Sequence, residues 1–334
     1  MSTDRILLAH GDGGQLMADL IAQVFVARLG AGDPPGDDAA QFAASGRLAF
    51  TTDAFVVDPI FFPGGDIGRL AVCGTVNDLA TAGARPLALS ASFIIEEGFP
   101  IAALERVADS MAHTADEAAV RIVTGDTKVV PRGKADKLYI STSGVGEIAE
   151  EICISGANVQ VGDVVIVTGP VGDHGLAVLS QREGLEFESG IVSDCAPLAE
   201  MVQALLCATP ATHSLRDPTR GGLAAALNEI ARQSQVEIEI VEADVPVRPS
   251  VAAACELLGL DPLYAANEGK MAVFVSPDQA QRALQALSEH KYGRDATMIG
   301  RATRRCPGRV LLKTALGTHR ILDRHVGEQM PRIC

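Results

Sequence analysis

The feature that most constrains the fold of this chain is an alternation of strand-like and helix-like segments that starts anew near residue 160. In the second half, Asp163 introduces the apolar run Val164–Thr168, which is typical of a buried strand, and Gly169-Pro170 ends it. Each half opens with strands and then covers them with helices. With 334 residues, and roughly 150 residues per domain, the pattern predicts two α+β (mixed α/β) domains that meet near 150–160.

Hydrophobic periodicity and chain breakers place the individual elements. Apolar residues at intervals of three and four predict helices over 15–29, 68–82, 102–119, 175–181, 197–208, 221–234 and 250–258. Apolar and β-branched runs predict strands over 48–52, 54–57, 120–124, 137–141, 164–168, 236–241, 271–275, 297–300 and 309–313. We therefore divide the chain into an amino-terminal helix with a glycine-rich segment (1–36), a first domain (37–155), a second domain (156–320) and a tail (321–334). The tail lacks periodicity and is expected to be flexible.

Acidic residues recur beside glycines or at the ends of predicted strands; they are Asp37, Asp38, Asp53, Asp78 and Asp126. Carboxylates are hard oxygen ligands for Mg²⁺, which bridges to substrate phosphates, and glycine lets backbone amides approach phosphate oxygens closely. A single aspartate is more often a helix cap or a turn former. Only the whole set indicates a site for a nucleotide and magnesium.

Composition excludes several classes of protein. A net charge of −14, no Trp and only three Tyr disfavour binding to nucleic acid or to an anionic membrane. The uncharged run 201–215 is interrupted by Pro210 and is too short to span a bilayer, and the first residues lack the pattern of a signal peptide. Seven scattered cysteines without Cys-x-x-Cys spacing favour reduced thiols in the cytoplasm.

Conventional catalytic motifs are absent. The sequence has no Gly-x-x-x-x-Gly-Lys-[Ser/Thr], no Gly-x-Ser-x-Gly and no His-Glu-x-x-His. Gly144–Ala149 matches Gly-x-Gly-x-x-Ala, but the residues after it do not predict a crossover helix. A dinucleotide site, a serine hydrolase and a zinc protease are therefore not supported.

The acidic motifs, taken in order, resemble the ATP-binding half of the aminoimidazole ribonucleotide synthetase superfamily, which includes selenophosphate synthetase and thiamine-monophosphate kinase. The motifs that carry this resemblance are 10–14, 36–39, 52–53, 63–68, 76–80 and 125–128. Within the superfamily, Asp217–Gly222, Ala266–Gly269 and Pro331–Cys334 resemble the HypE family, the carbamoyl dehydratases of nickel–iron hydrogenase maturation. The resemblance covers essentially the whole chain.

The resemblance implies both a fold and an activity. Members are homodimers whose amino-terminal sheets join into a barrel, with ATP and Mg²⁺ near that interface. The partner HypF loads a carbamoyl group onto the last cysteine, ATP phosphorylates the carbamoyl oxygen, and loss of phosphate leaves a thiocyanate. The cyanide ligand then passes to iron on the HypC–HypD complex.

Carried over to this chain, the resemblance assigns roles to individual residues. The implied metal and nucleotide ligands are Asp38 (with Asp37 as the alternative), Asp53, Asp78 and Asp126, with Gly65 and Gly125 beside the nucleotide. The implied catalytic residues are Cys334 as the carrier, Glu268 as the general base, and Lys128 (with Lys134 as the alternative) as the cation for the transferred phosphate.

Two other functions stay open at this point. A small-molecule kinase on the same scaffold would use the ATP site but would have no use for Cys334 as a carrier. A scaffold that binds nucleotide only to organise partners would show no ATP turnover. The sequence also leaves open whether the tail lies in the nucleotide cleft or projects into solvent.

Overall fold

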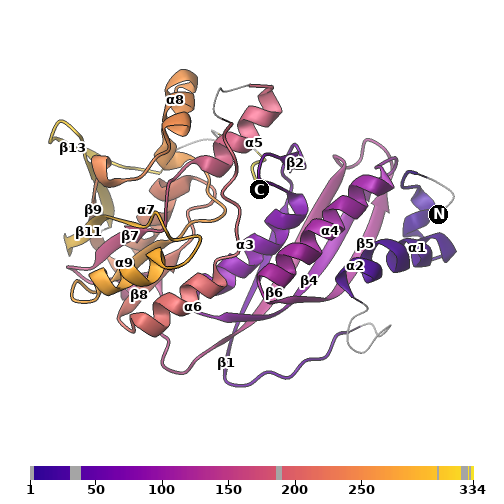
Figure 1. The fold of residues 1–334 in the computed structure, drawn as a ribbon, viewed down its shortest axis with the longest axis horizontal. Helices are drawn as coiled ribbons and strands as arrows, with labels where there is room; N and C mark the ends of the chain where they lie inside the picture. The colour runs from indigo at the N-terminus through magenta and orange to yellow at the C-terminus, as the bar shows by residue number, and fades with distance from the viewer. Residues whose placement is uncertain (1–3, 31–38, 186–189, 307, 325–329, 331) are drawn as a thin grey trace.

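The computed structural model describes all residues except 1–3, 31–38, 186–189, 307, 325–329 and 331. Two sheets lie side by side, each with its own helices (Figure 1). The first sheet has the strand order β1-β6-β4-β5, and the second has the order β13-β12-β9-β11-β7-β10-β8. β6 ends at Ile148 and β7 begins at Val164, so the predicted boundary near 150–160 falls between the sheets.

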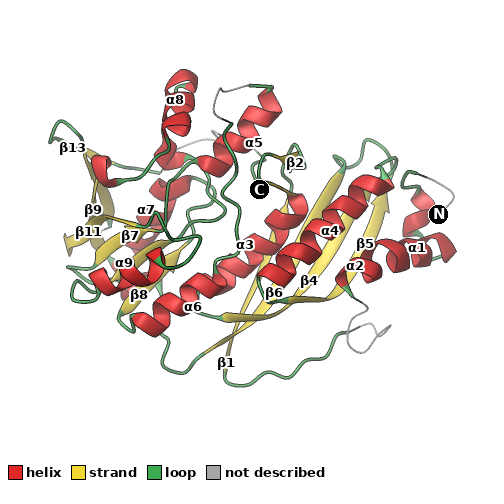
Figure 2. Ribbon diagram, in the orientation of Figure 1, coloured by secondary structure: helices red, strands yellow, loops and turns green. Residues whose placement is uncertain are grey.

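The first half consists of a four-stranded sheet covered by helices on one face (Figure 2). β1 pairs antiparallel with β6, β6 antiparallel with β4, and β4 parallel with β5. The elements of this half are α1 (Gln15–Leu20), a wider helical turn (Ile21–Val26), α2 (Ala27–Leu29), β1 (Arg47–Phe55), β2 (Phe61–Phe62), β3 (Gly65–Asp66), α3 (Ile67–Thr81), β4 (Arg85–Glu96), α4 (Ile101–Glu117), β5 (Arg121–Val130) and β6 (Leu138–Ile148).

Helix α3 is the central element of the molecule. Asp66 caps its amino terminus, because the carboxylate accepts hydrogen bonds from the backbone N–H groups of Gly68 (2.7 Å) and Arg69 (3.0 Å). Gly68 permits close packing on α4, since a Cβ atom there would lie 2.5 Å from the backbone oxygen of Val107. Most α3 residues are buried, as expected for a helix packed between the first sheet, α4 and the second half.

The second half is a mostly antiparallel seven-stranded sheet with its helices. Its elements are β7 (Val164–Val167), α5 (Asp173–Glu183), α6 (Ala199–Ala208), β8 (Thr212–Arg216), α7 (Gly222–Ser234), β9 (Val236–Val241), α8 (Pro249–Leu258), β10 (Ala272–Val275), α9 (Ala280–Ser288), β11 (Thr297–Arg305), β12 (Arg309–Lys313) and β13 (His319–Ile321). Among the described residues, no helix is long and apolar enough to cross a membrane.

The predicted helices are all present, within a few residues at each end, and helix 15–29 contains a wider turn in its middle. The expected strands 48–52 and 54–57 form one strand, β1, and the strands predicted at 120–124 and 137–141 are longer in the structure. Strand β4 was not predicted, because its first half (Arg-Pro-Leu-Ala-Leu-Ser-Ala-Ser) has weak intrinsic strand preference. Burial between two strands and against α3 stabilises it instead.

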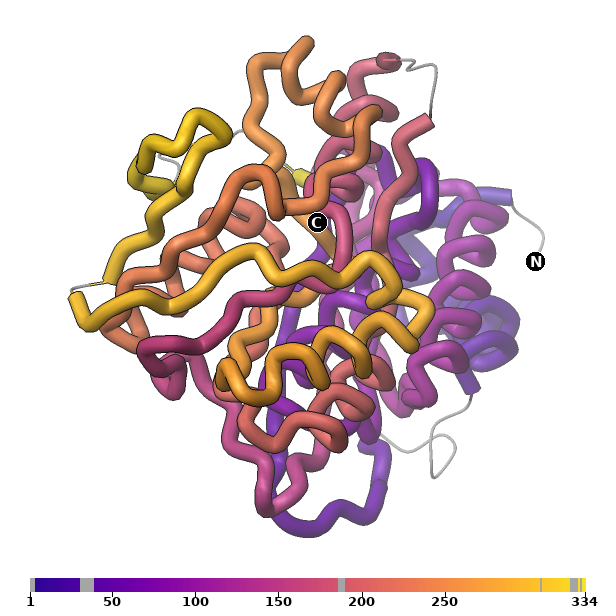
Figure 3. The backbone as a smooth tube through the Cα atoms, turned by 60° about the vertical axis from the view of Figure 1, so that its left-hand side comes forward, coloured from indigo at the N-terminus to yellow at the C-terminus, as the bar shows by residue number. Residues whose placement is uncertain are grey.

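The two halves share one hydrophobic core, to which α3 and α4 contribute from the first half and α6, α9 and β10 from the second. The carboxyl end of the chain lies between the halves, close to the start of α3 (Figure 1). The view in Figure 3 places it between them as well. The functional site is built around this point.

Candidate functional site

The last three residues of the chain lie along the segment that follows β1. The backbone N–H of Val56 donates to the backbone oxygen of Cys334 (3.2 Å), and that of Asp58 donates to the backbone oxygen of Arg332 (3.2 Å). The side chain of Ile333 is only 2% exposed. These residues are therefore packed into the first half, although mobility of the tail as a whole stays a prediction.

Helix α5 of the second half holds the same segment from the other side. His174 donates from Nε2 to the backbone oxygen of Ile333 (3.0 Å), because a carbonyl oxygen can only accept. Arg182 donates to the backbone oxygens of Arg332 (2.7 Å) and Asp58 (2.7 Å). Cys334 is thus positioned by both halves of the molecule.

The thiol of Cys334 lies in an acidic environment. Burial first, and then the charges of Glu268, Asp53 and Asp217, raise its pKa to about 12, against the lowering effect of Arg220. The thiol is therefore neutral here at pH 7, and Arg332, the cation nearest in sequence, instead pairs with Asp136. A neutral sulfur suits a site that receives an uncharged S-carbamoyl group better than one that activates a nucleophile.

Glu268 lies beside this thiol and is almost fully buried, with 3% of its surface exposed. Burial raises its pKa well above the ordinary value, and Cys195 and nearby carboxylates add to the effect. Its backbone is fixed by Asn77 of α3, whose side-chain amide donates to the backbone oxygens of Glu268 (3.2 Å) and Ala196 (3.0 Å). The Val76–Ala80 motif therefore anchors the second half through Asn77.

Asp53 and Asp78, two of the predicted metal ligands, lie next to each other. Burial first, and then the charge of Asp78 and a hydrogen bond between the two carboxyl groups, raise the pKa of Asp53 to about 6, although Arg220 lowers it. The hydroxyl of Thr51 donates to Asp78 (2.7 Å). Two crowded carboxylates fit a divalent cation, because Mg²⁺ binds one or two carboxylates and takes its other ligands from water and phosphate. No group of three acidic, His or Cys side chains in the described chain has metal-ligand geometry.

Asp126 and Lys128 lie on β5, apart from Asp53 and Asp78. Asp53 is opposite Thr142, Thr142 opposite Ala91, and Ala91 opposite Gly125, so three strand spacings of about 4.8 Å separate β1 from β5 at this level. Asp126 follows Gly125 and therefore points to the other face of the sheet. There it pairs with Lys128 (2.7 Å), and both side chains are more than half exposed.

Of the remaining predicted residues, the two glycines pack on neighbouring elements, Lys134 is exposed, and two aspartates are outside the described part of the chain. Gly125 packs on β4, since a Cβ atom there would lie 2.5 Å from the backbone oxygen of Ala91, and Gly65 packs on the Phe62 ring. Lys134 is exposed between β5 and β6. Asp37 and Asp38 lie outside the described residues.

Sequence reasoning missed several residues around Cys334. Asp217 has its pKa raised to about 7, by burial first and then by the charge of Asp78. Asp217 and Arg220 belong to the Asp217–Gly222 motif, which could have indicated them. His174 and Arg182 lie at the start and end of α5, and no pattern in the sequence connects them with the tail.

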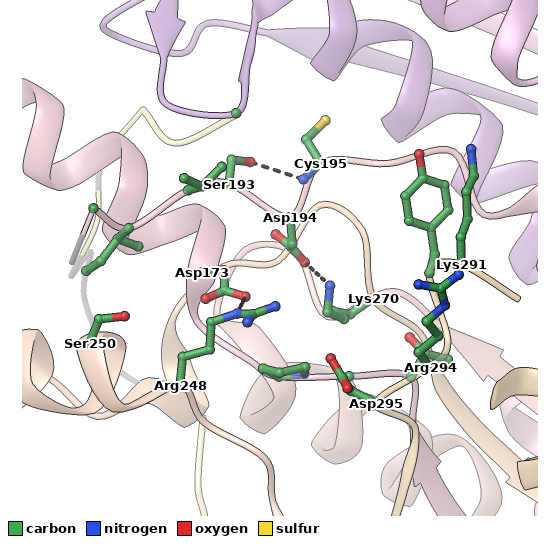
Figure 4. Close-up of a pocket in the computed structure, with 18 of the residues that line it drawn as sticks. Asp173, Ser193, Asp194, Cys195, Arg248, Ser250, Lys270, Lys291, Arg294 and Asp295 are labelled. Atoms are coloured by element: carbon green, nitrogen blue, oxygen red, sulfur yellow. Dashed lines mark hydrogen bonds and ion pairs between the residues drawn. The ribbon is translucent and has the colours of Figure 1, made fainter.

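A pocket of about 600 Å³ lies next to this region, and Ser193, Asp194, Cys195 and Lys270 are among the residues that line it (Figure 4). Burial alone would raise the pKa of Asp194, but Lys270, which pairs with it (3.1 Å), and the backbone N–H of Glu268 keep it below its usual value. Glycine is required at position 269, because a Cβ atom there would lie 1.8 Å from the backbone oxygen of Asp194. The buried ion pair thus fixes the loop that carries Glu268.

Comparison with known proteins gives the family. The AIR synthase related protein N-terminal domain matches residues 36–148, and the corresponding C-terminal domain matches residues 160–313. Carbamoyl dehydratase HypE of Bradyrhizobium diazoefficiens is 52% identical over 330 residues, which cover 98% of this chain and 95% of that protein.

Solved structures agree with this assignment. Hydrogenase maturation protein HypE in complex with ATP superimposes with a TM-score of 0.94 at 48% identity, covering 98% of this chain and 99% of that one. The HypE–HypF complex superimposes with a TM-score of 0.82 at 47% identity, covering 93% and 100%. Thiamine-monophosphate kinase of Stenotrophomonas maltophilia, at 22% identity and a TM-score of 0.64 over 87% and 90%, shares the fold alone. Two matching domains and a close relative over almost the full length place this chain in the carbamoyl dehydratase HypE family, with the aminoimidazole ribonucleotide synthetase fold.

Proposed function

We propose that this protein uses ATP to dehydrate a carbamoyl group, carried as a thiocarboxamide on Cys334, to a thiocyanate that supplies the cyanide ligand for hydrogenase iron. The observation that carries the proposal is the position of Cys334, which lies beside the buried carboxyl of Glu268 and is held by both halves of the chain. A kinase for a diffusible substrate would have no use for this arrangement. Neither would a non-catalytic scaffold.

The chemistry divides into two stages. The carbamoyl oxygen attacks the γ-phosphorus of ATP, ADP leaves, and the nitrogen loses one proton, which gives an O-phosphorylated imidate. The nitrogen then loses its second proton while the C–O bond breaks, so that inorganic phosphate leaves and a C≡N group remains on sulfur. Phosphorylation is needed because an amide oxygen is otherwise a poor leaving group.

Residues of this chain match the needs of each stage. Glu268 is the candidate base for the nitrogen protons, because its buried carboxyl has a raised pKa and becomes a strong base once ionised. Burial of Ile333 shields the chain next to the partly exposed Cys334 and so limits the access of water that would hydrolyse the thiocarboxamide. Asp53 and Asp78 would hold Mg²⁺, which neutralises triphosphate charge when it is bound. Arg220 is the cation next to the thiol and to Asp53.

The metal assignment predicts a specific loss of binding. Asp78→Asn keeps the shape of the side chain but removes its charge. The Mg²⁺-dependent part of ATP affinity should therefore fall by at least roughly tenfold, because loss of a residue that only hydrogen-bonds to a metal ligand already weakens metal binding by about that factor. Asp126→Asn should show the same loss if its carboxylate reaches the nucleotide from a second subunit. Asp116→Asn, on the exposed side of α4, is the matched control. Unchanged calorimetric affinity in both test variants would remove the assignment.

A homodimer is the second part of the proposal. In the described part of the chain, the face of the first sheet opposite α3 and α4 carries no helix (Figure 2), and Leu48, Phe50 and Ile94 are exposed on it, Phe50 by 72%. Asp126 and Lys128 point from the same face. A second copy that packs on this face would cover the apolar side chains, close a barrel, and bring Asp126 and Lys128 to a shared nucleotide site.

The dimer is tested by light scattering. The wild-type protein should have twice the mass of one chain at micromolar concentration, and Phe50→Glu should give monomers, because it places a charge in the apolar contact. Leu316→Glu is the control, since Leu316 is 91% exposed in a turn of the second half. A wild-type monomer, or a Phe50→Glu dimer, contradicts this model.

Partners and location complete the proposal. We assign loading of the carbamoyl group to HypF, in line with the HypE–HypF complex of the relative, and delivery of the cyanide ligand to HypC–HypD, all in the cytoplasm. The decisive experiment is intact mass spectrometry with HypF, its carbamoyl donor and ATP. A carbamoyl adduct that loses the mass of one water when ATP is added supports the function. An adduct that never loses this mass contradicts the proposal.

A further inference from the structure

A chain of hydrogen bonds ends on the tail, one residue before the thiol. The backbone N–H of Cys195 donates to Oγ of Ser193 (3.1 Å), and Ser193 Oγ lies 2.8 Å from Nδ1 of His174. His174 Nε2 lies 3.0 Å from the backbone oxygen of Ile333. His174 and Ser193 are both buried.

The two ends of this chain fix the direction of every bond. An N–H group can only donate and a carbonyl oxygen can only accept, so Nε2 of His174 must carry the proton that Ile333 receives. Burial lowers the pKa of His174, which keeps the ring neutral, so Nδ1 is free to accept the Ser193 hydroxyl proton. In this tautomer, which the Ile333 carbonyl requires, the Ser193 hydroxyl donates to Nδ1 and so holds the ring in the orientation that binds the tail.

Contacts with the first half keep the imidazole ring in place. Phe62 of β2 meets His174 edge to face, with ring centroids 5.4 Å apart and an interplanar angle of 87°. The backbone N–H of Ser193 donates to the backbone oxygen of Pro63 (2.8 Å). The ring is thus held between the halves, in contact with Phe62 and with the backbone oxygen of Ile333.

We propose that His174, oriented by Ser193, is the positioning residue that seats the tail and so places the sulfur of Cys334 beside Glu268 for dehydration. This inference rests on the proposed function and adds a requirement to it: the seat acts in the dehydration stage and not in loading. During loading by a partner enzyme Cys334 reacts in the partner's site, so the bond from His174 to Ile333 is not needed there.

Two measurements test the seat. The first is the alkylation rate of Cys334 by iodoacetamide in the protein alone, read on the carboxy-terminal peptide, because Cys153 and Cys207 are exposed and also react. The second is the single-turnover rate at which the carbamoyl adduct becomes the cyanide adduct. ATP affinity and the extent of carbamoyl loading serve as reference readouts.

His174→Ala should raise alkylation and slow dehydration by roughly ten- to hundredfold each, since a buried hydrogen bond is lost and its carbonyl is left without a partner. ATP affinity and loading should not change. His174→Gln should restore most of both rates, because its Nε2 can donate from a similar position. The two rates in Ser193→Ala should lie between those of His174→Ala and His174→Gln, because this substitution removes the hydrogen bond to Nδ1 but keeps the imidazole ring. His113→Ala, on the exposed side of α4, is the matched control.

Wild-type alkylation and dehydration rates in His174→Ala would overturn the proposal. Equal losses in His174→Ala and His174→Gln would also overturn it, because they would assign the effect to ring packing on Phe62. If the wild-type protein fails to convert the adduct at all, the proposed function fails, whereas the alkylation rates of the variants still decide whether His174 seats the tail.

Discussion

Cys334→Ala is expected to give a protein that folds, dimerises and binds ATP but never acquires a carbamoyl or cyanide adduct. The other described cysteines have different surroundings. Cys73, Cys195 and Cys255 are buried, Cys153 and Cys207 are exposed, and Cys306 is half-buried. Cys195 also lies near Glu268, but it is fully buried and burial helps to raise its pKa, whereas Cys334 is partly exposed at the chain end, is held by both halves, and lies near Glu268 and Asp53. The loss should therefore be complete.

Intact mass spectrometry after incubation with the loading enzyme and ATP measures this loss. Cys334→Ser is the closer replacement in shape, and it should behave like alanine because a hydroxyl is far less nucleophilic than a thiol. Cys207→Ala, at an exposed position on α6, is the matched control and should load normally. A cyanide adduct on any other residue of Cys334→Ala would disprove the carrier assignment and the mechanism with it.

Glu268→Gln should load the carbamoyl group normally and then stop. The amide keeps the size and hydrogen-bonding capacity of the side chain but cannot accept a nitrogen proton, so dehydration should slow by about 10²–10⁴-fold. The measurement is the single-turnover rate of conversion of the carbamoyl adduct. Glu256→Gln, exposed on α8, is the control.

The pH dependence of the same rate tests the role of Glu268 independently. A base acts only when ionised, and burial holds the pKa of Glu268 well above its ordinary value. Dehydration should therefore be slow below that raised pKa and increase as the pH rises through it. Glu268→Gln should lose this acidic limb, leaving a residual rate without it. A wild-type rate that falls as the pH rises, or the same limb in the variant, would contradict the assignment.

Local patterns were enough to predict most of the fold. The helices follow from apolar spacing and from breakers at their ends, as in α3, where Asp66 supplies the cap. Strand β4 was not predicted, because its Ala- and Ser-rich half is stabilised by pairing with the adjacent strands and not by the intrinsic strand preference of its residues. Strand β5 was predicted too short because Gly125 and Asp126 interrupt the apolar pattern, although β4 pairs with both.

The candidate site divides in the same way. The family motifs singled out Asp53, Asp78, Glu268 and Cys334, and the structure brings these residues together from four distant parts of the chain. The motif containing Asp126 and Lys128 was equally visible, yet both side chains point from the opposite face of the sheet, toward the surface that we assign to a second subunit. Alternation along a strand decides this, and only the register of the sheet shows which face each residue takes.

The sequence by itself determined the family, the order of the elements and the chemical types at the site, because these depend on residue identity and short-range spacing. Only the tertiary structure decided where the carboxyl end lies and which groups hold it. His174, Arg182 and Val56 reach it across more than a hundred residues of chain through backbone oxygens and a backbone N–H. Every residue except proline carries both backbone groups, so bonds to them leave no signature in the residue pattern and become visible only when packing brings the partners together.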